Sequence, residues 1–229
     1  TNLLRAISHD LRTPLTSIYG SCSAIMENYD RLKKEQTWKL LGEMKEDAEW
    51  LIRMVENLLS VTRLDGNAAS VVKRPIVLEE LIDAVLVKFK KRYPNQPVQV
   101  QIPDQFVSIP MDAMLIEQVL INILENAVFH AGNISLLSLR VFLSGPRAVF
   151  EISDDGCGIP RDRLNTLFSG YSGKGPAPAD GNKHGMGIGL SVCATIIRAH
   201  GGDMQAESRA GKGTVMRFSL ETEDVEHEQ

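Results

Sequence analysis

Apolar residues recur along the first part of the chain at spacings of three and four, the pattern of an amphipathic helix. A first series consists of Leu4, Ile7, Leu11, Leu15, Ile18, Cys22 and Ile25, and a second of Leu41, Met44, Ala48, Leu51, Val55, Leu58 and Thr62. The polar segment NYDRLKKEQ separates the two series. The second series alternates strictly between steps of three and four, as in helical bundles. We therefore expect an antiparallel helical hairpin, two copies of which pair into a four-helix bundle.

The helical pattern stops at RLDGNAASVVKRPI, where Gly66, small polar residues and Pro75 predict a linker. Beyond the linker, apolar periodicities predict helices near 78–92, 112–130 and 188–200, a short helix before 169, and strands near 98–102, 106–109, 135–144, 148–154, 203–208 and 213–221. These elements do not alternate as regular βαβ units. We therefore expect an α+β sandwich with one helical layer, and not a doubly wound parallel sheet.

Composition narrows the class of protein. With 43% hydrophobic and 24% charged residues, the chain has the make-up of a globular protein. Its net charge of -4 gives no reason to expect nucleic acid as a partner, because phosphate binding needs a basic face. The three cysteines have spacings that suit neither a disulfide framework nor a zinc site, which favours a reducing compartment. No apolar run reaches the length of a membrane span, so we expect no membrane contact by this stretch.

The first helix carries reactive residues in the segment SHDLRTPL. His9 lies on the side of the helix opposite the apolar series, and Asp10 is close enough to hydrogen-bond one imidazole nitrogen. Such a contact leaves the other nitrogen free to act as a nucleophile. Pro14 removes a backbone hydrogen bond one turn later and predicts a bend in the helix. The alternative is that His9 is an ordinary surface residue.

In the second domain, Asn122, Glu125 and Asn126 form a polar stripe on an otherwise apolar helix. Amide and carboxylate oxygens in this arrangement suit a hard cation and its phosphate ligands, although simple solvation of the helix also explains them. The segment DDGCGIP places Asp154 between a strand and two glycines, Gly156 and Gly158. An acid there can accept a hydrogen bond from an exocyclic amine, and glycines allow a flat ring to approach the backbone. The alternative is a plain turn.

Two further glycine segments follow. GMGIGL precedes a helix, so its glycines can present backbone N–H groups to phosphates at a helix N-terminus. The segment before it is polar and glycine-rich, typical of a mobile lid, and its Lys174 and Lys183 are placed to reach a polyphosphate. GKGT, with Gly211 and Gly213, predicts a tight turn into the last strand.

In chain order, SHDLRTPL, QVLINILENA, DDGCGI, GMGIGL and GKGT resemble the H, N, G1, G2 and G3 boxes of sensor histidine kinases, and the resemblance covers essentially the whole chain. It implies a dimerisation and phosphotransfer domain (1–66), a linker (67–75), an ATP-binding domain of the Hsp90, gyrase, MutL and histidine kinase type (76–222), and an acidic tail (223–229). The implied cofactors are ATP and Mg²⁺. The implied partners are a second copy, through residues 1–66, and the receiver domain of a response regulator.

The resemblance also implies roles for residues of the first domain. His9 matches the histidine that accepts the γ-phosphoryl group of ATP and passes it to an aspartate of the regulator. Asp10 matches the acid that assists this step. Thr13 matches the residue that positions water for dephosphorylating the regulator, so the same helix would add and remove the signal.

In the second domain, the resemblance makes Asn126 the asparagine that associates with magnesium through the phosphates, and Glu125 a further metal residue. Asp154 matches the aspartate that reads the adenine amino group. The other implied nucleotide contacts are Asn122, His130, Gly156, Gly158, Lys183, Gly185, Gly187, Gly189, Leu190 and Thr214.

The chain departs from the family pattern at two places. Phe129 stands where relatives commonly have a lysine that contacts phosphate, and LFSGYSGKG matches the F box only at Phe168 and Tyr171. These departures motivate an alternative function, a signalling module that binds nucleotide weakly and acts mainly as a phosphatase or dimeric scaffold. A superfamily ATPase coupled to conformational work is a second alternative, but it leaves His9 unexplained.

Within the family, SHDLRTPLT and NLLSVTRLDG are most similar to the KdpD-type potassium and turgor sensors. The chain begins within a predicted helix and without a methionine, so we take it for a fragment. The resemblance then implies a complete protein anchored in the cell membrane, with this fragment in the cytoplasm.

Overall fold

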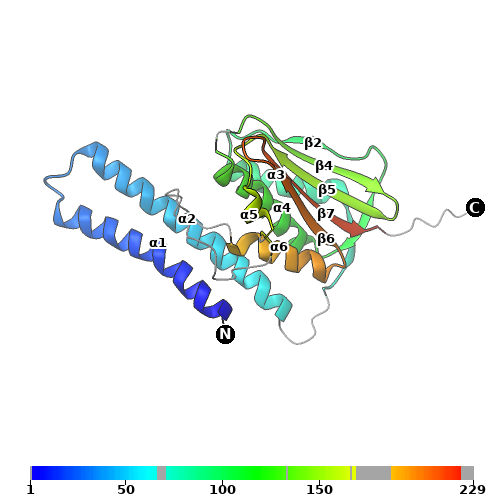
Figure 1. Ribbon diagram of the computed structural model, residues 1–229, viewed down its shortest axis with the longest axis horizontal. Coiled ribbons are helices and arrows are strands. Elements are labelled where there is room, and N and C mark those ends of the chain that lie inside the picture. Colours follow the sequence, from blue (N-terminus) through cyan, green and yellow to red (C-terminus); the bar gives the residue numbers. More distant parts are fainter. Residues whose placement is uncertain (1, 66–70, 133, 166, 169–186, 223–229) are drawn as a thin grey trace, which may run out of the picture. The chain divides into compact units, whose positions relative to one another are not determined.

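A computed structural model describes residues 2–65, 71–132, 134–165, 167–168 and 187–222, with their side chains except those of 2–10, 57–65, 130, 187 and 188. These residues form two compact units, a helical hairpin and a unit of mixed helices and strands (Figure 1). Both units were predicted from the sequence, and the predicted fold class is confirmed.

The hairpin consists of α1 (Asn2–Glu27) and α2 (Lys34–Asp65). α1 continues as one helix through Pro14, which is buried. The two helices contact each other where Sγ of Cys22 lies 4.0 Å from Sδ of Met44. At the start of α2, the backbone N–H of Lys33 donates to Oε1 of Gln36 at 3.0 Å, which satisfies a donor at the helix N-terminus.

The hairpin of a single chain leaves large apolar side chains exposed, namely Leu15, Tyr19, Met26, Tyr29, Trp38, Leu41, Ile52 and Val55. Apolar surface of this extent normally marks contact with another protein. The exposure therefore supports the expected pairing of two hairpins into a four-helix bundle.

The second unit is built on a five-stranded sheet with the strand order β2-β4-β5-β7-β6. The strands are β2 (Gln99–Gln101), β4 (Leu137–Ser144), β5 (Arg147–Asp154), β6 (Asp203–Ser208) and β7 (Thr214–Glu221). β2 pairs with β4 in parallel, and the other neighbours are antiparallel. On the three central strands, alternate residues are buried, including the stacked rings of Phe150 and Phe218, whose centroids are 4.6 Å apart.

Helices cover only the apolar face of this sheet (Figure 1). They are α3 (Leu78–Arg92), α4 (Ala113–His130) and α6 (Gly187–Ala199), with the short α5 (Arg161–Leu164) after β5. The other face carries charges paired across strands: Arg217 contacts Glu151 at 2.6 Å and Glu207 at 2.7 Å. α4 begins where its N-cap, Asp112, accepts hydrogen bonds from the backbone N–H groups of Met114 and Leu115.

One strand was missed in the sequence. Residues Arg74–Val77 form β1, which pairs antiparallel with β3 (Ser108–Met111) in a separate two-stranded sheet. Pro75 suggested a linker because proline has no N–H to donate. A two-stranded sheet consists of edges only, however, and edges tolerate proline; Pro75 faces Pro110 in the register. The predicted strand near 106–109 was also placed about two residues too early.

In the part of the chain that the structure describes, no helix is both long enough and apolar enough to cross a bilayer.

Candidate functional site

Helices α4 and α6 run antiparallel, which brings the polar stripe of α4 to the first turn of α6. At the C-terminus of α6, Nε2 of His200 accepts a hydrogen bond from the N-cap residue of α4 at 3.1 Å. Farther along, Nδ2 of Asn122 donates to Sγ of Cys193 at 3.7 Å. Asn126 is four residues after Asn122 on α4, and Gly189 is four residues before Cys193 on α6, which is about 6 Å along each helix axis. This spacing places Asn126 and Gly189 at the same level of the helix pair. Amide side chains and a helix N-terminus therefore meet at one end of this helix pair.

Asp154 lies at the end of β5, half-buried. Its Oδ1 accepts a hydrogen bond from the backbone N–H of Gly156 at 2.9 Å, and the backbone N–H of Thr214 is a second donor to the carboxylate. Burial raises the pKa of the Asp154 carboxyl above its ordinary value, while these two backbone hydrogen bonds act in the opposite direction. A partly desolvated carboxylate held by the backbone is a suitable acceptor for an amine donor of a ligand.

The turn after Asp154 interlocks with the turn between β6 and β7. The backbone N–H of Gly213 donates to the carbonyl of Gly156 at 2.8 Å, and that of Gly211 donates to the carbonyl of Cys157 at 2.7 Å. A Cβ atom on Gly158, whose φ is +71°, would lie 2.1 Å from the carbonyl oxygen of Arg209. The two turns therefore approach each other more closely than any residue with a side chain allows.

The same turn also contacts the C-terminal end of α4. The backbone N–H of Cys157 donates to the carbonyl of Ala131 at 2.7 Å, and a Cβ atom on Gly156 would lie 2.2 Å from the Cβ atom of Ala131. Oδ1 of Asp155 accepts from the backbone N–H groups of Ser135 at 2.9 Å and Leu136 at 3.0 Å. The Ser135 hydroxyl also donates to Asp155, and these bonds lower the pKa of its carboxyl. The end of α4 and the acid at the end of β5 are thus fixed to each other.

A different face of α4 contacts α3. Oε1 of Glu125, which is only 4% exposed, accepts a hydrogen bond from Nη1 of Arg92 at 2.8 Å. One turn later the ring of Phe129 packs edge-on against Tyr93, with centroids 5.9 Å apart. Phe129 therefore contributes to the contact between these two helices.

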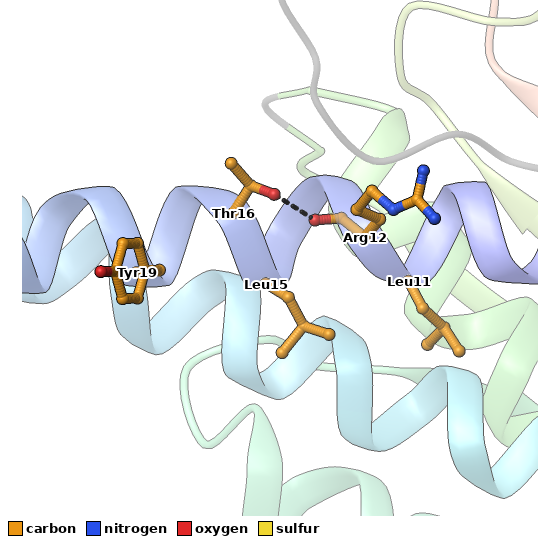
Figure 2. Close-up of a pocket in the computed structure, with 5 residues that line it drawn as sticks. All are labelled: Leu11, Arg12, Leu15, Thr16 and Tyr19. Carbon is orange, nitrogen blue, oxygen red and sulfur yellow. Dashed lines mark hydrogen bonds between the residues drawn. The ribbon is translucent and has the colours of Figure 1, made fainter.

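On the hairpin, a shallow hollow lies along the turns of α1 that contain Thr13. Figure 2 shows its lining, Leu11, Arg12, Leu15, Thr16 and Tyr19. The apolar side chains of Leu11 and Leu15 point to one side of α1, and those of Arg12 and Thr16 to the other. The Thr16 hydroxyl donates to the carbonyl of Arg12 at 2.8 Å, so this hydroxyl is occupied within its own helix.

Two parts of the chain match known protein families. Residues 1–67 match the family described as "His Kinase A (phospho-acceptor) domain", and residues 111–224 match "Histidine kinase-, DNA gyrase B-, and HSP90-like ATPase". The chain belongs to the sensor histidine kinases. α1 therefore lies in the part of the chain that matches the phospho-acceptor domain, and α4 and the end of β5 lie in the part that matches the ATPase.

Two relatives agree with the predicted KdpD-type similarity. Sensor protein KdpD of Clostridium acetobutylicum is 36% identical over 97% of this chain and 25% of its own length, and KdpD of Escherichia coli K12 is 30% identical over 95% and 24%. The chain thus spans about a quarter of the length of these relatives. Among solved structures, histidine kinase ThkA in complex with response regulator protein TrrA has a TM-score of 0.70 at 22% identity, covering 96% of this chain and 61% of that one.

The structure places only some of the predicted site residues of this histidine kinase. His9 and Asp10 lie in α1, but their side chains fall outside the described part, as do the side chain of His130 and the whole of Lys183 and Gly185. Gly187 is described only as the first residue of α6. Thr13 is exposed. In the α+β unit, direct contacts join Asp154 to Gly156 and Thr214, whose backbone N–H groups donate to its carboxylate. The other predicted site residues that the structure describes in this unit are Asn122, Glu125, Asn126, Gly158, Gly189 and Leu190.

Several of these residues also have a structural role in the fold, apart from any role in binding. Gly156 and Gly158 were interpreted as clearance for a flat ring, yet they are also required by the close approach of Ala131 and Arg209. Leu190 is fully buried, so its side chain packs in the core. Thr214 is 7% exposed, and its hydroxyl lies 3.1 Å from that of Ser208.

Sequence reasoning missed the residues that hold the site in place. Arg92 and Cys193 are far along the chain from Glu125 and Asn122. Ser208 is far along the chain from one of its partners, Ile159. No local pattern marks any of these contacts. Ser208 donates to the carbonyl of Gly213 and accepts from the backbone N–H of Ile159, both at 2.7 Å. Asp155 carried the only usable signal, since an aspartate before glycine is typical of a turn with side-chain hydrogen bonds to the backbone.

Proposed function

We propose that this chain is an ATP-dependent protein-histidine kinase that phosphorylates its own His9. The observation that supports it most directly is the match to a phosphoacceptor domain followed by an ATPase domain in one chain. An imidazole nitrogen of His9 attacks the γ-phosphorus of ATP. The nitrogen–phosphorus bond forms, the bond from the γ-phosphorus to the bridging oxygen breaks, and ADP leaves. Asp10 binds the other ring nitrogen and stabilises the positive charge on the ring.

ATP binds in the α+β unit with its adenine amino group donating to Asp154. The carboxylate is half-buried and already held by two backbone N–H groups, so little reorganisation is needed when the base arrives. The phosphates lie towards Asn126 and the first turn of α6, whose backbone N–H groups attract anions. Lys183 and the glycines of GMGIGL are the other predicted phosphate contacts.

Magnesium accompanies the nucleotide. Among the residues whose side chains are described, no group of three or more His, Cys, Asp or Glu side chains is arranged to hold a metal. At ATP sites, Mg²⁺ is held by one or two protein ligands together with phosphate oxygens, and the amide oxygen of the half-buried Asn126 fits this role. The ion neutralises charge on the phosphates when it is bound. Glu125 is a second candidate ligand, and its contact with Arg92 competes with that role.

The phosphoryl group then passes from His9 to an aspartate of a response regulator, as the nitrogen–phosphorus bond breaks and an oxygen–phosphorus bond forms. The likeness to ThkA, solved in complex with response regulator protein TrrA, supports such a partner. Thr13 is exposed one turn after His9, where it can orient a water molecule that hydrolyses the aspartyl phosphate of the regulator and releases inorganic phosphate. Residues 1–66 form the homodimer through the exposed apolar side chains of the hairpin.

Incubation with labelled ATP and magnesium tests the proposal. We expect a phosphoprotein that is labile in acid and stable in base, and we expect no label on the His9→Gln variant. His227→Gln, the same change in the acidic tail, is the matched control and should label like the original chain. Asp154→Asn should weaken ATP binding, because its amide group presents a donor towards the adenine amine. Equal labelling of His9→Gln and the original chain would rule out His9 as the acceptor.

A second candidate function follows from Phe129. Its ring packs against Tyr93, so this position makes a helix contact where relatives commonly have a phosphate-binding lysine. A kinase without that contact binds ATP more weakly and acts mainly as a regulator phosphatase or dimeric scaffold. Dephosphorylation of a regulator without detectable labelling of His9 would favour this function. In that case Thr13→Ala should abolish the phosphatase activity.

A further inference from the structure

The ion pair between Arg92 and Glu125 connects the end of α3 to the turn of α4 that carries the magnesium-associated asparagine. Arg92 is the last residue of α3, and Glu125 immediately precedes Asn126. The Nη1 to Oε1 distance is 2.8 Å, with the glutamate side chain 5% exposed and the arginine side chain 45% exposed. A carboxylate so deeply buried is stable only with a charged or hydrogen-bonding partner.

Glu125 and Asn126 face different neighbours. Successive residues of a helix are rotated by about 100°. Asn126 is about 40° from Asn122, which bonds Cys193 of α6, so both asparagines lie on the α6 side. Glu125 lies on the α3 side, where Arg92 contacts it. The contact with Arg92 therefore holds Oε1 of Glu125 towards α3 and away from the side on which Asn126 lies.

Two more contacts join the same faces of α3 and α4. Lys88 forms an ion pair with Glu117 near the start of α4, and Phe129 packs against Tyr93 near its end. The Arg92 pair lies between them and is far more buried than the Lys88 pair, whose side chains are 60% and 18% exposed. Loss of the Arg92 pair therefore disturbs the interface most, because it leaves a buried charge without its partner.

We propose that Glu125 is a positioning residue, held by Arg92, which fixes the last turns of α4 and so places Asn126 for phosphate-bound magnesium. Glu125 is not itself a metal ligand. This inference rests on the proposed function, since it assigns a role towards the ATP and magnesium site. Arg92 is then necessary for the geometry of the ATP and magnesium site, although α3 itself contributes no residue to that proposed site.

The test measures the affinity of the full chain for a fluorescent ATP analogue and, separately, the Mg²⁺ concentration that gives half-maximal binding. We expect Arg92→Gln and Glu125→Gln each to weaken nucleotide affinity by about tenfold or more, the usual cost of removing a partner that orients a ligand. The half-saturating Mg²⁺ concentration should shift by the same factor in both variants. Lys88→Gln, which breaks the exposed pair, is the matched control and should change affinity less than about twofold.

The double variant Arg92→Met, Glu125→Leu removes both charges and retains apolar volume, so it keeps the helices packed where a single variant fails to fold. A positioning role predicts that this double variant binds nucleotide more tightly than either single variant. If Glu125 is instead a metal ligand, Glu125→Gln and the double variant should both need far more Mg²⁺ for half-maximal nucleotide binding, while Arg92→Gln should not. That result would overturn the inference. Unchanged affinity in all three variants also overturns it. If the original chain binds no nucleotide, the proposed function itself fails.

Discussion

The turn between β6 and β7 contains two glycines that share a backbone conformation but differ in the space around them. Gly211 and Gly213 have φ values of +74° and +78°, both in the left-handed region. A Cβ atom on Gly213 would lie 1.9 Å from the carbonyl oxygen of Asp154, whereas a Cβ atom on Gly211 would meet nothing within 4 Å. Replacing each with alanine therefore separates backbone strain from crowding of the site.

The expected losses of stability follow from these two effects. An L-residue in the left-handed conformation costs about 1–2 kcal/mol, and both variants bear this cost. Overpacking against a fixed neighbour adds about 1–3 kcal/mol, and only Gly213→Ala bears it. The free energy of unfolding of the α+β unit should therefore fall by about 1–2 kcal/mol in Gly211→Ala and about 2–5 kcal/mol in Gly213→Ala.

Urea unfolding followed by circular dichroism measures this difference. The chain has two tryptophans, Trp38 and Trp50, and both lie in α2, so fluorescence follows the hairpin separately. The fluorescence transition should be the same in both variants and in the original chain. Equal losses in the two variants would refute the reasoning, because they would mean that the approach of this turn to Asp154 carries no energetic weight.

Two further predictions concern titratable groups of the same unit. Burial lowers the pKa of His200, which faces Lys73 and Asp112, so the folded state favours the neutral imidazole. The free energy of unfolding should therefore fall as the pH drops below the unfolded-state pKa of about 6.5 towards the folded-state pKa. In His200→Gln, urea unfolding across this pH range should show a smaller fall. In Asp155→Ala, the backbone amide hydrogens of Ser135 and Leu136 should exchange at least about tenfold faster, as measured by mass spectrometry, because the variant removes their acceptor. In the original chain, the lowered pKa of Asp155 should keep these amides protected below the pH at which an ordinary aspartate titrates. Unchanged exchange in Asp155→Ala would contradict this role of Asp155.

The elements that sequence reasoning placed correctly are those whose signals are local. The span of α4 follows from its apolar periodicity and from Asp112 as N-cap, and β6 from a short run between turns. β1 was missed because its signal is not local. Its existence depends on pairing with β3, and Pro75 argued against a strand unless that strand is an edge.

The candidate site shows the same division. The residue types at the end of β5 and on α4 predicted a nucleotide site, because carboxylate, amide and glycine have known uses at strand ends and helix termini. Their supports were not predictable. Arg92 reaches Glu125 across 33 positions of sequence, and Asn122 reaches Cys193 across 71, and nothing in the local pattern selects such pairs. Local chemistry therefore predicted which residues bind a ligand, while the tertiary contacts show what holds those residues in place.

The contacts of α6 indicate which end of this helix is free to respond to nucleotide. Its C-terminal end is held from three sides: Nζ of Lys73 donates to the carbonyl of His200 at 2.8 Å, Nη2 of Arg147 donates to that of Gly201 at 3.0 Å, and the backbone N–H of Asp112 donates to the His200 ring at 3.1 Å. Cations at a helix C-terminus are also favoured by the helix dipole. Because displacement grows with distance from the end of a helix that is held in place, we expect any adjustment of α6 to nucleotide to be largest in its first, glycine-containing turn. Lys73, the residue before β1, makes one of these three contacts, so the segment that leads into β1 also takes part in fixing α6.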